Sequence, residues 1–444
     1  MCTEKERYQR IVQKGVSPFE CDIATGDAAH EMMVKQYARS AADQERPLPH
    51  ELRSEKIMNH AMCYLLHNIL DEFPESADQR AAWYNFLWSR TRALRKEVTQ
   101  LSMSDLLALN LVERCTRLHI LFGYVLCDLE TEHFDTAMNN ETLGKCLQTL
   151  RHLYEDFAKR GIPCENEPEF RAYDVMLHMN DTNVLSQVLS YRSDVRQSQP
   201  ICLALKLAGA FRDKNYCRFF RLLKNEATFL QCCVSHKLFG ATRSNAISIM
   251  VNSYGRNAFP LEKLRNILAF DLIEEVTETL NIYGLRTESE SDHVMLTKDG
   301  LTLNESVPMK PYQWIDQKKT GKLSQVVYGP NLFQFFASRC DVSNSFNHRN
   351  EYTNDKVLEA VLDGSNIPVS SDPSAFSFAQ SAGSLSMQAT MEQKRKMEVE
   401  RIKRKLVFED SPTSVQAFLL PAQMIFQLVD LLELEIHEFS VLAP

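Results

Sequence analysis

The chain has 444 residues, which is enough for two or three domains and for a sizeable hydrophobic core. Hydrophobic residues make up 44% of it and charged residues 24%, a globular composition that excludes a wholly disordered chain. Only 14 glycines and 16 prolines occur, so we expect long helices rather than an all-β sandwich. Because the net charge is −8, binding to nucleic acid would need a local basic patch.

The sequence has no recognisable signal peptide or membrane span, and its cysteine usage indicates a protein of the cytosol or nucleus. No run of about 18 apolar residues occurs, so we expect no membrane insertion. Residues 1–14 are charged and do not contain the apolar stretch of a signal peptide. The twelve cysteines are scattered without a C-x-x-C pair, which predicts reduced, buried thiols.

Residues 1–54 are predicted to form an N-terminal arm, extended or helical, and residues 55–257 a helical repeat domain. Apolar residues recur there at helical spacing. From about residue 180 the helices shorten to 10–14 residues with short turns, as in stacked helical hairpins. The predicted helices lie at about 140–160, 166–178, 181–190, 200–213, 215–225, 227–240 and 242–254. The sequence shows no strict repeat period, so the prediction of a tetratricopeptide-like hairpin array rests on helix length alone.

Residues 258–330 are predicted to form a winged-helix domain. One helix opens at Phe259-Pro260-Leu261, with the proline in its first turn, and a second runs over 272–280. Alternating stretches at 285–287 and 293–297 predict two strands. Helical hairpins followed by a winged helix are the layout of PCI-type scaffold proteins, so the predicted fold is mainly α and PCI-like.

The end of the chain differs in composition from the rest. Residues 331–390 are predicted to be a partly disordered linker, because 363–390 are rich in serine. Residues 391–444 combine a basic helix of net charge +4 over 391–406 with an apolar segment after Pro421. We expect a flexible tail whose apolar segment binds a partner or docks back.

Signatures of catalysis are missing from the sequence. No P-loop, dinucleotide-binding, nucleophile-elbow or H-E-x-x-H motif occurs. His60 and His67 are two helical turns apart, too far to share one metal without Cys63 between them, and all three are better interpreted as interior residues. We therefore predict a protein that is not an enzyme and has no catalytic residues, metal or cofactor.

Two basic clusters are candidate nucleic-acid sites. In the first, Arg90, Arg92 and Arg95 stand close to aromatic residues that could stack on bases. The alternative is structural, with Trp83 in the core and the arginines paired to acids of a neighbouring helix, such as Glu113.

The second cluster follows the predicted wing and could reach phosphates without reading bases. It consists of Lys298, Lys310, Lys318, Lys319 and Lys322. The alternative is a solvated surface without a nucleic-acid role. The helix that would enter a DNA groove carries Glu274, Glu275 and Glu278, so we expect contact with protein or RNA rather than sequence-specific DNA reading.

Five blocks of sequence resemble the Sac/GANP domain family, in particular its GANP/Xmas branch, over roughly residues 1–330. The clearest block is Trp83–Arg95, which reads W-x-x-F-x-W-x-R-T-R-x-x-R. The other blocks are Met1–Arg7 with Lys35–Ser40, Ala42–Glu45 and Pro47–Arg53; Glu113–Arg117 with His119-Ile120; Asn139–Glu141 with Lys145–Gln148; and Arg218–Leu222. The family motif usually has proline where Thr3 stands and often follows a Phe-Gly-rich arm. Whether this chain is a form lacking that arm stays open.

The resemblance implies a scaffold subunit of the nuclear-pore-associated mRNA-export complex. Such a subunit pairs with a PCI-type partner that holds a small acidic Dss/Sem protein, and it binds RNA or single-stranded nucleic acid. Longer relatives also recruit centrin and a Sus/ENY-type subunit. We therefore expect a location in the nucleus and at the nuclear pore, with some protein in the cytoplasm. The alternative, suggested by a shorter centrosome-associated paralogue, is a spindle adaptor without an RNA role.

The end of the helical array and the winged helix are where we expect the PCI-type partner to bind. The candidate partner-binding residues there are Phe219, Phe220, Leu272, Ile273, Val294 and Leu296. In the apolar tail they are Ile425, Leu428 and Leu432.

Overall fold

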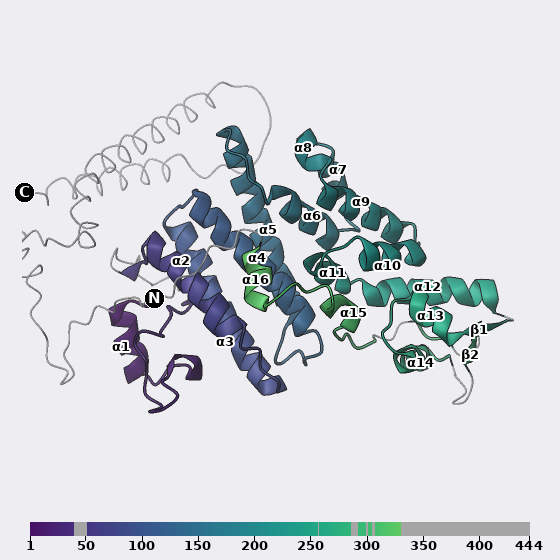
Figure 1. Cartoon of the computed structure of the whole chain (residues 1–444), viewed down its shortest axis with the longest axis horizontal. Coiled ribbons are helices and arrows are strands. Elements are labelled where there is room, and N and C mark those ends of the chain that lie inside the picture. Colours follow the sequence, from purple (N-terminus) through teal and green to yellow (C-terminus); the bar gives the residue numbers. More distant parts are fainter. Residues whose placement is uncertain (40–50, 256, 286–291, 299–300, 304–306, 330–444) are drawn as a thin grey trace, which may run out of the picture. The chain divides into compact units, whose positions relative to one another are not determined.

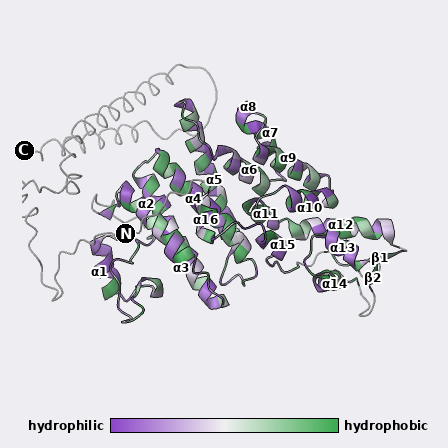
Figure 2. Cartoon of the chain, in the orientation of Figure 1, coloured by the Kyte–Doolittle hydropathy of each residue, from purple (hydrophilic) through white to green (hydrophobic). Residues whose placement is uncertain are grey.

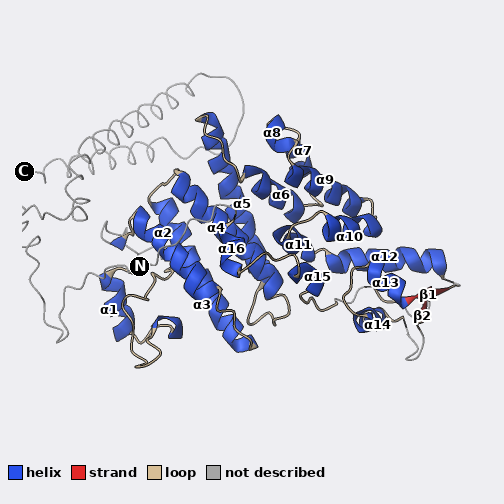
Figure 3. Cartoon of the chain, in the orientation of Figure 1, coloured by secondary structure: helices blue, strands red, loops and turns tan. Residues whose placement is uncertain are grey.

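The structure is a computed structural model that describes residues 1–39, 51–255, 257–285, 292–298, 301–303 and 307–329. These residues are mainly helical with one small pair of strands (Figure 3), which confirms the mainly helical class that the sequence predicts. The described residues belong to one compact unit, Met1–Asn344. The predicted linker and tail, with Ile425, Leu428 and Leu432, lie outside the described residues.

An N-terminal arm precedes the helical stack. It contains helix α1 (Glu4–Val12) and the short turn η1 (Pro18–Glu20), followed by an extended segment. The arm packs against the long helix α3 (Ala77–Gln100) through two buried carboxylates. Glu20 of the arm pairs with Arg90 of α3, and Glu97 of α3 pairs with Lys35 and Arg53 of the arm. Buried ion pairs therefore fix the arm to α3 at two points.

Packed helices run from residue 55 to residue 254, and we call them the helical stack (Figure 1). In chain order they are α2 (Glu55–Tyr64) continued by the π-helical turn η3 (Leu65–Leu70), α3, α4 (Leu106–Val125), α5 (Thr136–Lys159), α6 (Glu167–Leu177), α7 (Thr182–Val188), α8 (Ser193–Arg196), α9 (Gln199–Arg212), α10 (Tyr216–Asn225), α11 (Phe229–His236) and α12 (Phe239–Tyr254). Helix α4 packs on α5, and α6 on α9, which packs on α10. Figure 2 shows hydrophobic and hydrophilic residues mixed along these helices, as amphipathic packing requires.

Polar side chains begin many of these helices, where free backbone N–H groups need acceptors. Asp105 accepts from the amide of Ala108 at 2.8 Å and begins α4. Asp135 begins α5 in the same way, and Thr228 forms a capping box with Gln231 at the start of α11. The seven helices predicted between residues 140 and 254 all occur, with ends shifted by at most four residues.

The described residues between 258 and 303 form two helices and a two-stranded antiparallel sheet. Strand β1 (Ala258–Pro260) precedes α13 (Leu261–Ile267) and α14 (Ile273–Ile282), and β2 (His293–Met295) returns to pair with β1. Strand β2 falls in the second predicted strand, whereas residues 286 and 287 of the first lie outside the described residues. The helix predicted to open at 259–261 is confirmed, since α13 begins at Leu261, but Pro260 ends β1 and caps α13 rather than lying in its first turn. The winged-helix and tetratricopeptide-like assignments stay predictions.

After β2 the chain runs back over the helical stack, and we call residues 310–329 the return segment. It contains the short helices α15 (Gln313–Asp316) and α16 (Leu323–Tyr328). Its first half contacts α12 and the end of α13. Trp314 stacks on Phe239 with ring centres 6.0 Å apart and donates from its indole nitrogen to the carbonyl of Ala269 at 3.1 Å. Buried Arg243 of α12 donates to the Tyr312 hydroxyl and to the carbonyl of Ala269.

The second half of the return segment reaches the first helices of the stack. The backbone amide and hydroxyl of Ser324 donate to the carboxylate of Asp71 at 2.8 and 2.6 Å. The hydroxyl of buried Tyr328 lies 3.3 Å from Cys63 Sγ of α2, and Arg117 of α4 donates to the Tyr328 carbonyl at 3.3 Å. The return segment therefore connects the β1–β2 region to α2 and η3.

Candidate functional site

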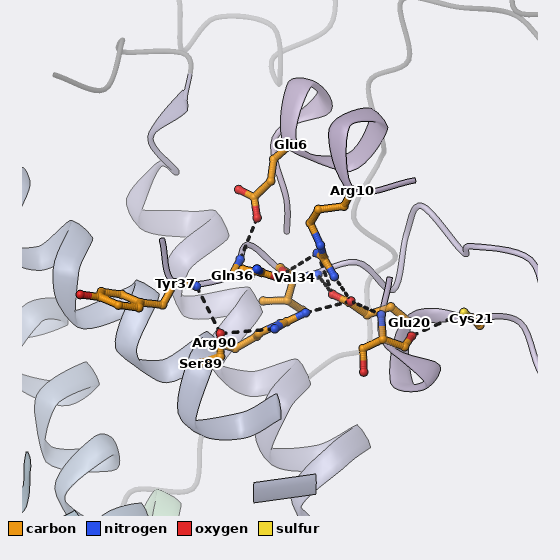
Figure 4. A network of polar contacts seen from close by, with 10 residues as sticks. Glu6, Arg10, Glu20, Cys21, Val34, Gln36, Tyr37, Ser89 and Arg90 are labelled. Carbon is orange, nitrogen blue, oxygen red and sulfur yellow. Dashed lines mark hydrogen bonds and ion pairs between the residues drawn. The ribbon is translucent and has the colours of Figure 1, made fainter. Parts of the chain in front are cut away.

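The three candidate arginines of α3 are held within the protein. Arg90 is buried, and its guanidinium donates to Glu20 at 2.9 Å while lying 4.3 Å from the centre of the Phe86 ring. The fully buried Glu20 carboxylate also pairs with Arg10 and accepts from the amide of Val34 (Figure 4). Burial lowers the pKa of Arg90, and the Glu20 carboxylate opposes that shift. Arg90 therefore fixes the arm and offers no donor at the surface.

Arg92 and Arg95 are half-buried. Arg92 lies over the Tyr37 ring at 3.9 Å and near the Trp88 ring, so both rings already have an internal cation on them. Arg95 donates to Cys146 Sγ of α5 at 3.3 Å. The alternative interpretation placed Trp83 in the core, and this part is correct because Trp83 is fully buried.

Glu113 is not the acid that pairs with these arginines, so that part of the structural alternative is wrong. Glu113 accepts from the Tyr154 hydroxyl at 2.7 Å and from the Asn166 amide at 2.8 Å, because its face of α4 packs on α5 and α6. Burial raises the pKa of this carboxyl. The acid that pairs with Arg90 is Glu20, which lies 70 residues earlier in the chain.

The candidate lysines differ in what their ammonium groups contact. Lys318 donates to the carbonyls of Lys224 and Ala227 at 2.7 and 2.9 Å, so it closes the end of α10. Lys310 pairs with Glu275 of α14 at 3.2 Å. Three others are exposed, namely Lys298 after β2 and Lys319 and Lys322 in the loop between α15 and α16. Of the five candidates, these three present their charge to solvent.

Two exposed arginines of α10 extend the basic surface, although the sequence-based candidates did not include them. Arg218 and Arg221 flank the buried Phe219 and Phe220, so they lie one turn apart on the solvent face. Since Lys318 closes the end of α10, it brings the loop holding Lys319 and Lys322 to this helix. The signal in the sequence was the spacing of two basic residues around an apolar pair.

Of the candidate partner-binding residues in the described part of the chain, four are buried and two are exposed. Phe219, Phe220, Val294 and Leu296 belong to the core. Leu272 and Ile273, at the start of α14, are 57% and 37% exposed. Met295 of β2 is also exposed, and the sequence-based candidates did not include it. Leu272 and Ile273 are consecutive, and adjoining exposed apolar side chains are typical of a protein-binding surface.

The two histidines with strongly lowered pKa values, His119 and His236, lie in the core rather than in an open cleft. Burial lowers the pKa of His119 to about 3 and that of His236 to about 4, and a nearby arginine adds to each shift. The described part of the chain holds no group of three or more His, Cys, Asp or Glu residues arranged to bind a metal. Among the same residues, no helix is both long and apolar enough to cross a membrane. What the described surface offers is basic and apolar contact area.

Comparisons with known proteins agree with the resemblance seen in the sequence. The model of the SAC3/GANP family matches residues 1–289. The chain is 34% identical to Protein xmas of Drosophila melanogaster over 75% of its length, and 30% identical to SAC3 family protein 1 of Schizosaccharomyces pombe over 69%. It is 27% identical to SAC3 family protein B of Arabidopsis thaliana over 74%. These matches span 16%, 32% and 20% of the three relatives. The chain belongs to the SAC3/GANP family.

Proposed function

We propose that this protein is a non-enzymatic scaffold subunit of an mRNA-export complex at the nuclear pore, which binds RNA and a PCI-type partner. Membership of the SAC3/GANP family is the observation that carries the proposal. The helical stack and the pair of helices between two strands support a tetratricopeptide-like and winged-helix arrangement. In this role the partner would hold a small acidic Dss/Sem protein. A Sus/ENY-type subunit and centrin would join longer forms.

The proposed RNA surface consists of Lys319 and Lys322 in the loop and Arg218 and Arg221 on α10. All four are exposed, and the Lys318 contact with the end of α10 supports their lying on one surface. Lysine and arginine bind phosphate without base selectivity, so we expect affinity for single-stranded RNA with weak sequence preference. Arg90, Arg92 and Arg95 are left out because internal partners hold them.

Salt dependence tests the RNA surface. In the variant with Lys319, Lys322, Arg218 and Arg221 changed to alanine, the slope of log affinity against log salt should flatten by about 0.7 for each phosphate that the protein no longer neutralises. Fluorescence anisotropy with a labelled oligoribonucleotide measures this slope. The matched control changes four exposed lysines of other helices, Lys56, Lys145, Lys206 and Lys263, to alanine. A slope equal to that of the unaltered chain would remove the four residues from the site.

The proposed partner surface is the start of α14, where Leu272 and Ile273 are exposed. A charged side chain there would have to lose its hydration in an apolar interface, so Leu272→Glu should abolish co-purification with the PCI-type subunit. Leu189→Glu is the control, because Leu189 is also exposed but lies at the end of α7. Retention of the partner by the Leu272 variant would contradict this surface.

A further inference from the structure

A cleft of about 440 Å³ opens between α5, α6 and the segment that joins α7 to α8. These elements neighbour one another in the upper part of Figure 1. None of the candidate RNA or partner residues lines it. The lining residues are Arg151, Tyr154, Glu155, Ala158, Lys159, Glu167, Arg171, Gln187, Ser190, Tyr191 and Arg192.

Three arginines in this cleft are held in place by two buried carboxylates. Glu167 of α6 accepts from Arg171 at 3.3 Å and from Arg192 at 2.8 Å, so one carboxylate positions two guanidinium groups. Asp174, two turns further along α6, accepts from Arg151 of α5 at 2.8 Å. Because the carboxylates are fixed by the fold, the guanidinium groups are oriented before any ligand arrives.

Two buried donors in the cleft have no acceptor among the described residues. They are the Nε–H of Arg151 and the hydroxyl of Tyr191. The guanidinium of Arg171 lies 4.8 Å from the centre of the Tyr191 ring, which places this tyrosine beside the arginines. A buried donor without an acceptor is unfavourable, so an incoming acceptor would gain from meeting both groups.

The lining residues include four cations, Arg151, Lys159, Arg171 and Arg192, and two carboxylates, Glu155 and Glu167. Buried Asp174 pairs with Arg151, and near the surface Asp156 and Asp194 lie 3.3 and 3.4 Å from Lys159 and Arg192. Glu155 is half-exposed and lies 3.8 Å from Arg171, so this contact is long and easily replaced. Because ion pairs at the surface contribute little, an anionic ligand with several acceptor oxygens can replace the contacts of Glu155, Asp156 and Asp194 with these cations.

We propose that this cleft binds a phosphate monoester, either on a phosphorylated side chain of a peptide or on a small polyphosphorylated molecule. A monoester carries close to two negative charges at neutral pH and three acceptor oxygens, and guanidinium groups match it in geometry. An RNA phosphodiester carries one charge per phosphate and needs a continuous groove. The cleft instead gathers its cations at one place, so the diester is the less suitable ligand.

Binding of a labelled phosphoserine hexapeptide to the full chain tests the proposal by fluorescence anisotropy. We expect binding that the unphosphorylated peptide does not show, and about tenfold weaker binding for Arg192→Gln, since one charge-assisted hydrogen bond is removed. Arg192 is half-exposed, so its replacement should leave the fold intact. Arg212→Gln, on an exposed arginine at the end of α9, is the matched control and should bind as the unaltered chain does.

Further arms separate the sources of the phosphate. In one outcome, neither peptide binds, and inositol hexakisphosphate binds the unaltered chain but not the Arg192→Gln variant. This result would assign the site to a small polyphosphorylated molecule. The proposal is overturned if the two peptides bind equally and the Arg192→Gln substitution does not change the affinity for inositol hexakisphosphate. The proposal is also overturned if a single-stranded oligoribonucleotide without a terminal phosphate binds the Arg192→Gln variant more weakly than the unaltered chain. That result would show that the cleft binds a phosphodiester. Because the proposed RNA surface on α10 does not involve Arg192, failure here leaves the proposed function standing.

Discussion

At the scale of the residue, Glu20 joins three segments of the protein. Its buried carboxylate pairs with Arg10 and Arg90 and accepts from the amide of Val34. Glu20→Gln should lower the free energy of unfolding by about 3–5 kcal/mol, because two buried guanidinium groups lose their counter-charge. Urea unfolding followed by circular dichroism measures this change. Exposed Glu132→Gln serves as control, and equal stability of the two variants would contradict the role of Glu20.

His236 predicts a dependence of stability on pH. Its pKa in the folded protein is about 4, mainly because it is buried, whereas the unfolded chain titrates near 6.5. Between these values the unfolded state binds more protons, so the free energy of unfolding falls as the pH falls. This histidine alone should account for about 3 kcal/mol at pH 4.

Replacement of His236 separates this contribution from that of other groups. His236→Gln keeps a donor for the carbonyl of Lys310, which the ring contacts at 3.0 Å, but cannot be protonated. The decrease in stability between about pH 6.5 and pH 4 should therefore be smaller in the variant than in the unaltered chain. Identical pH profiles in urea unfolding would show that the pKa of His236 is the same in the folded and unfolded states.

The sequence around an arginine did not show whether its side chain is held inside the protein or exposed at the surface. Arg90 and Arg218 both stand near aromatic residues in the sequence, yet Arg90 is buried and Arg218 is exposed. The difference arises from Glu20, whose pairing with Arg90 over 70 residues no local pattern encodes. Similarly, Lys318 and Lys319 are neighbours, but of the two it is Lys318 that reaches the carbonyls at the end of α10.

At the scale of the element, the return segment depends on polar contacts at its helix starts. Asp71→Ala removes the acceptor of both Ser324 donors and should lower the free energy of unfolding by about 1–2 kcal/mol. The backbone amides of α16 should then exchange hydrogen faster, since this short helix is no longer anchored beside η3. Hydrogen exchange with mass spectrometry measures this. Glu72→Ala is the neighbouring control, and unchanged exchange in the Asp71 variant would refute the anchor.

Helices were predictable from the sequence and the small sheet was only partly so. Apolar spacing and polar capping residues marked the helices between 140 and 254, because both signals are local. Strand β1 has only three residues and ends at Pro260, so its pairing with β2, more than thirty residues later, left no local pattern. The path of the return segment was equally hidden, since it follows from contacts such as that of Ser324 with Asp71.

At the scale of the whole molecule, the return segment should decide whether the helical body is stable. It supplies the buried side chains of Tyr312, Ile315, Val327 and Tyr328 to the common core. A chain ending at residue 329 should unfold cooperatively, and one ending at residue 309 should melt at a clearly lower temperature because the apolar surface beneath the segment is exposed. Differential scanning calorimetry compares the two. Equal melting temperatures would show that the segment adds nothing to stability.

The contact between Tyr328 and Cys63 joins residues 265 positions apart in the chain. During synthesis the first helices therefore emerge from the ribosome long before the residues that cover them. Until Tyr328 has left the exit tunnel, the surface around Cys63 stays open to chaperones or to premature association with other nascent chains. Translation speed between these two points should thus influence the yield of correctly assembled protein.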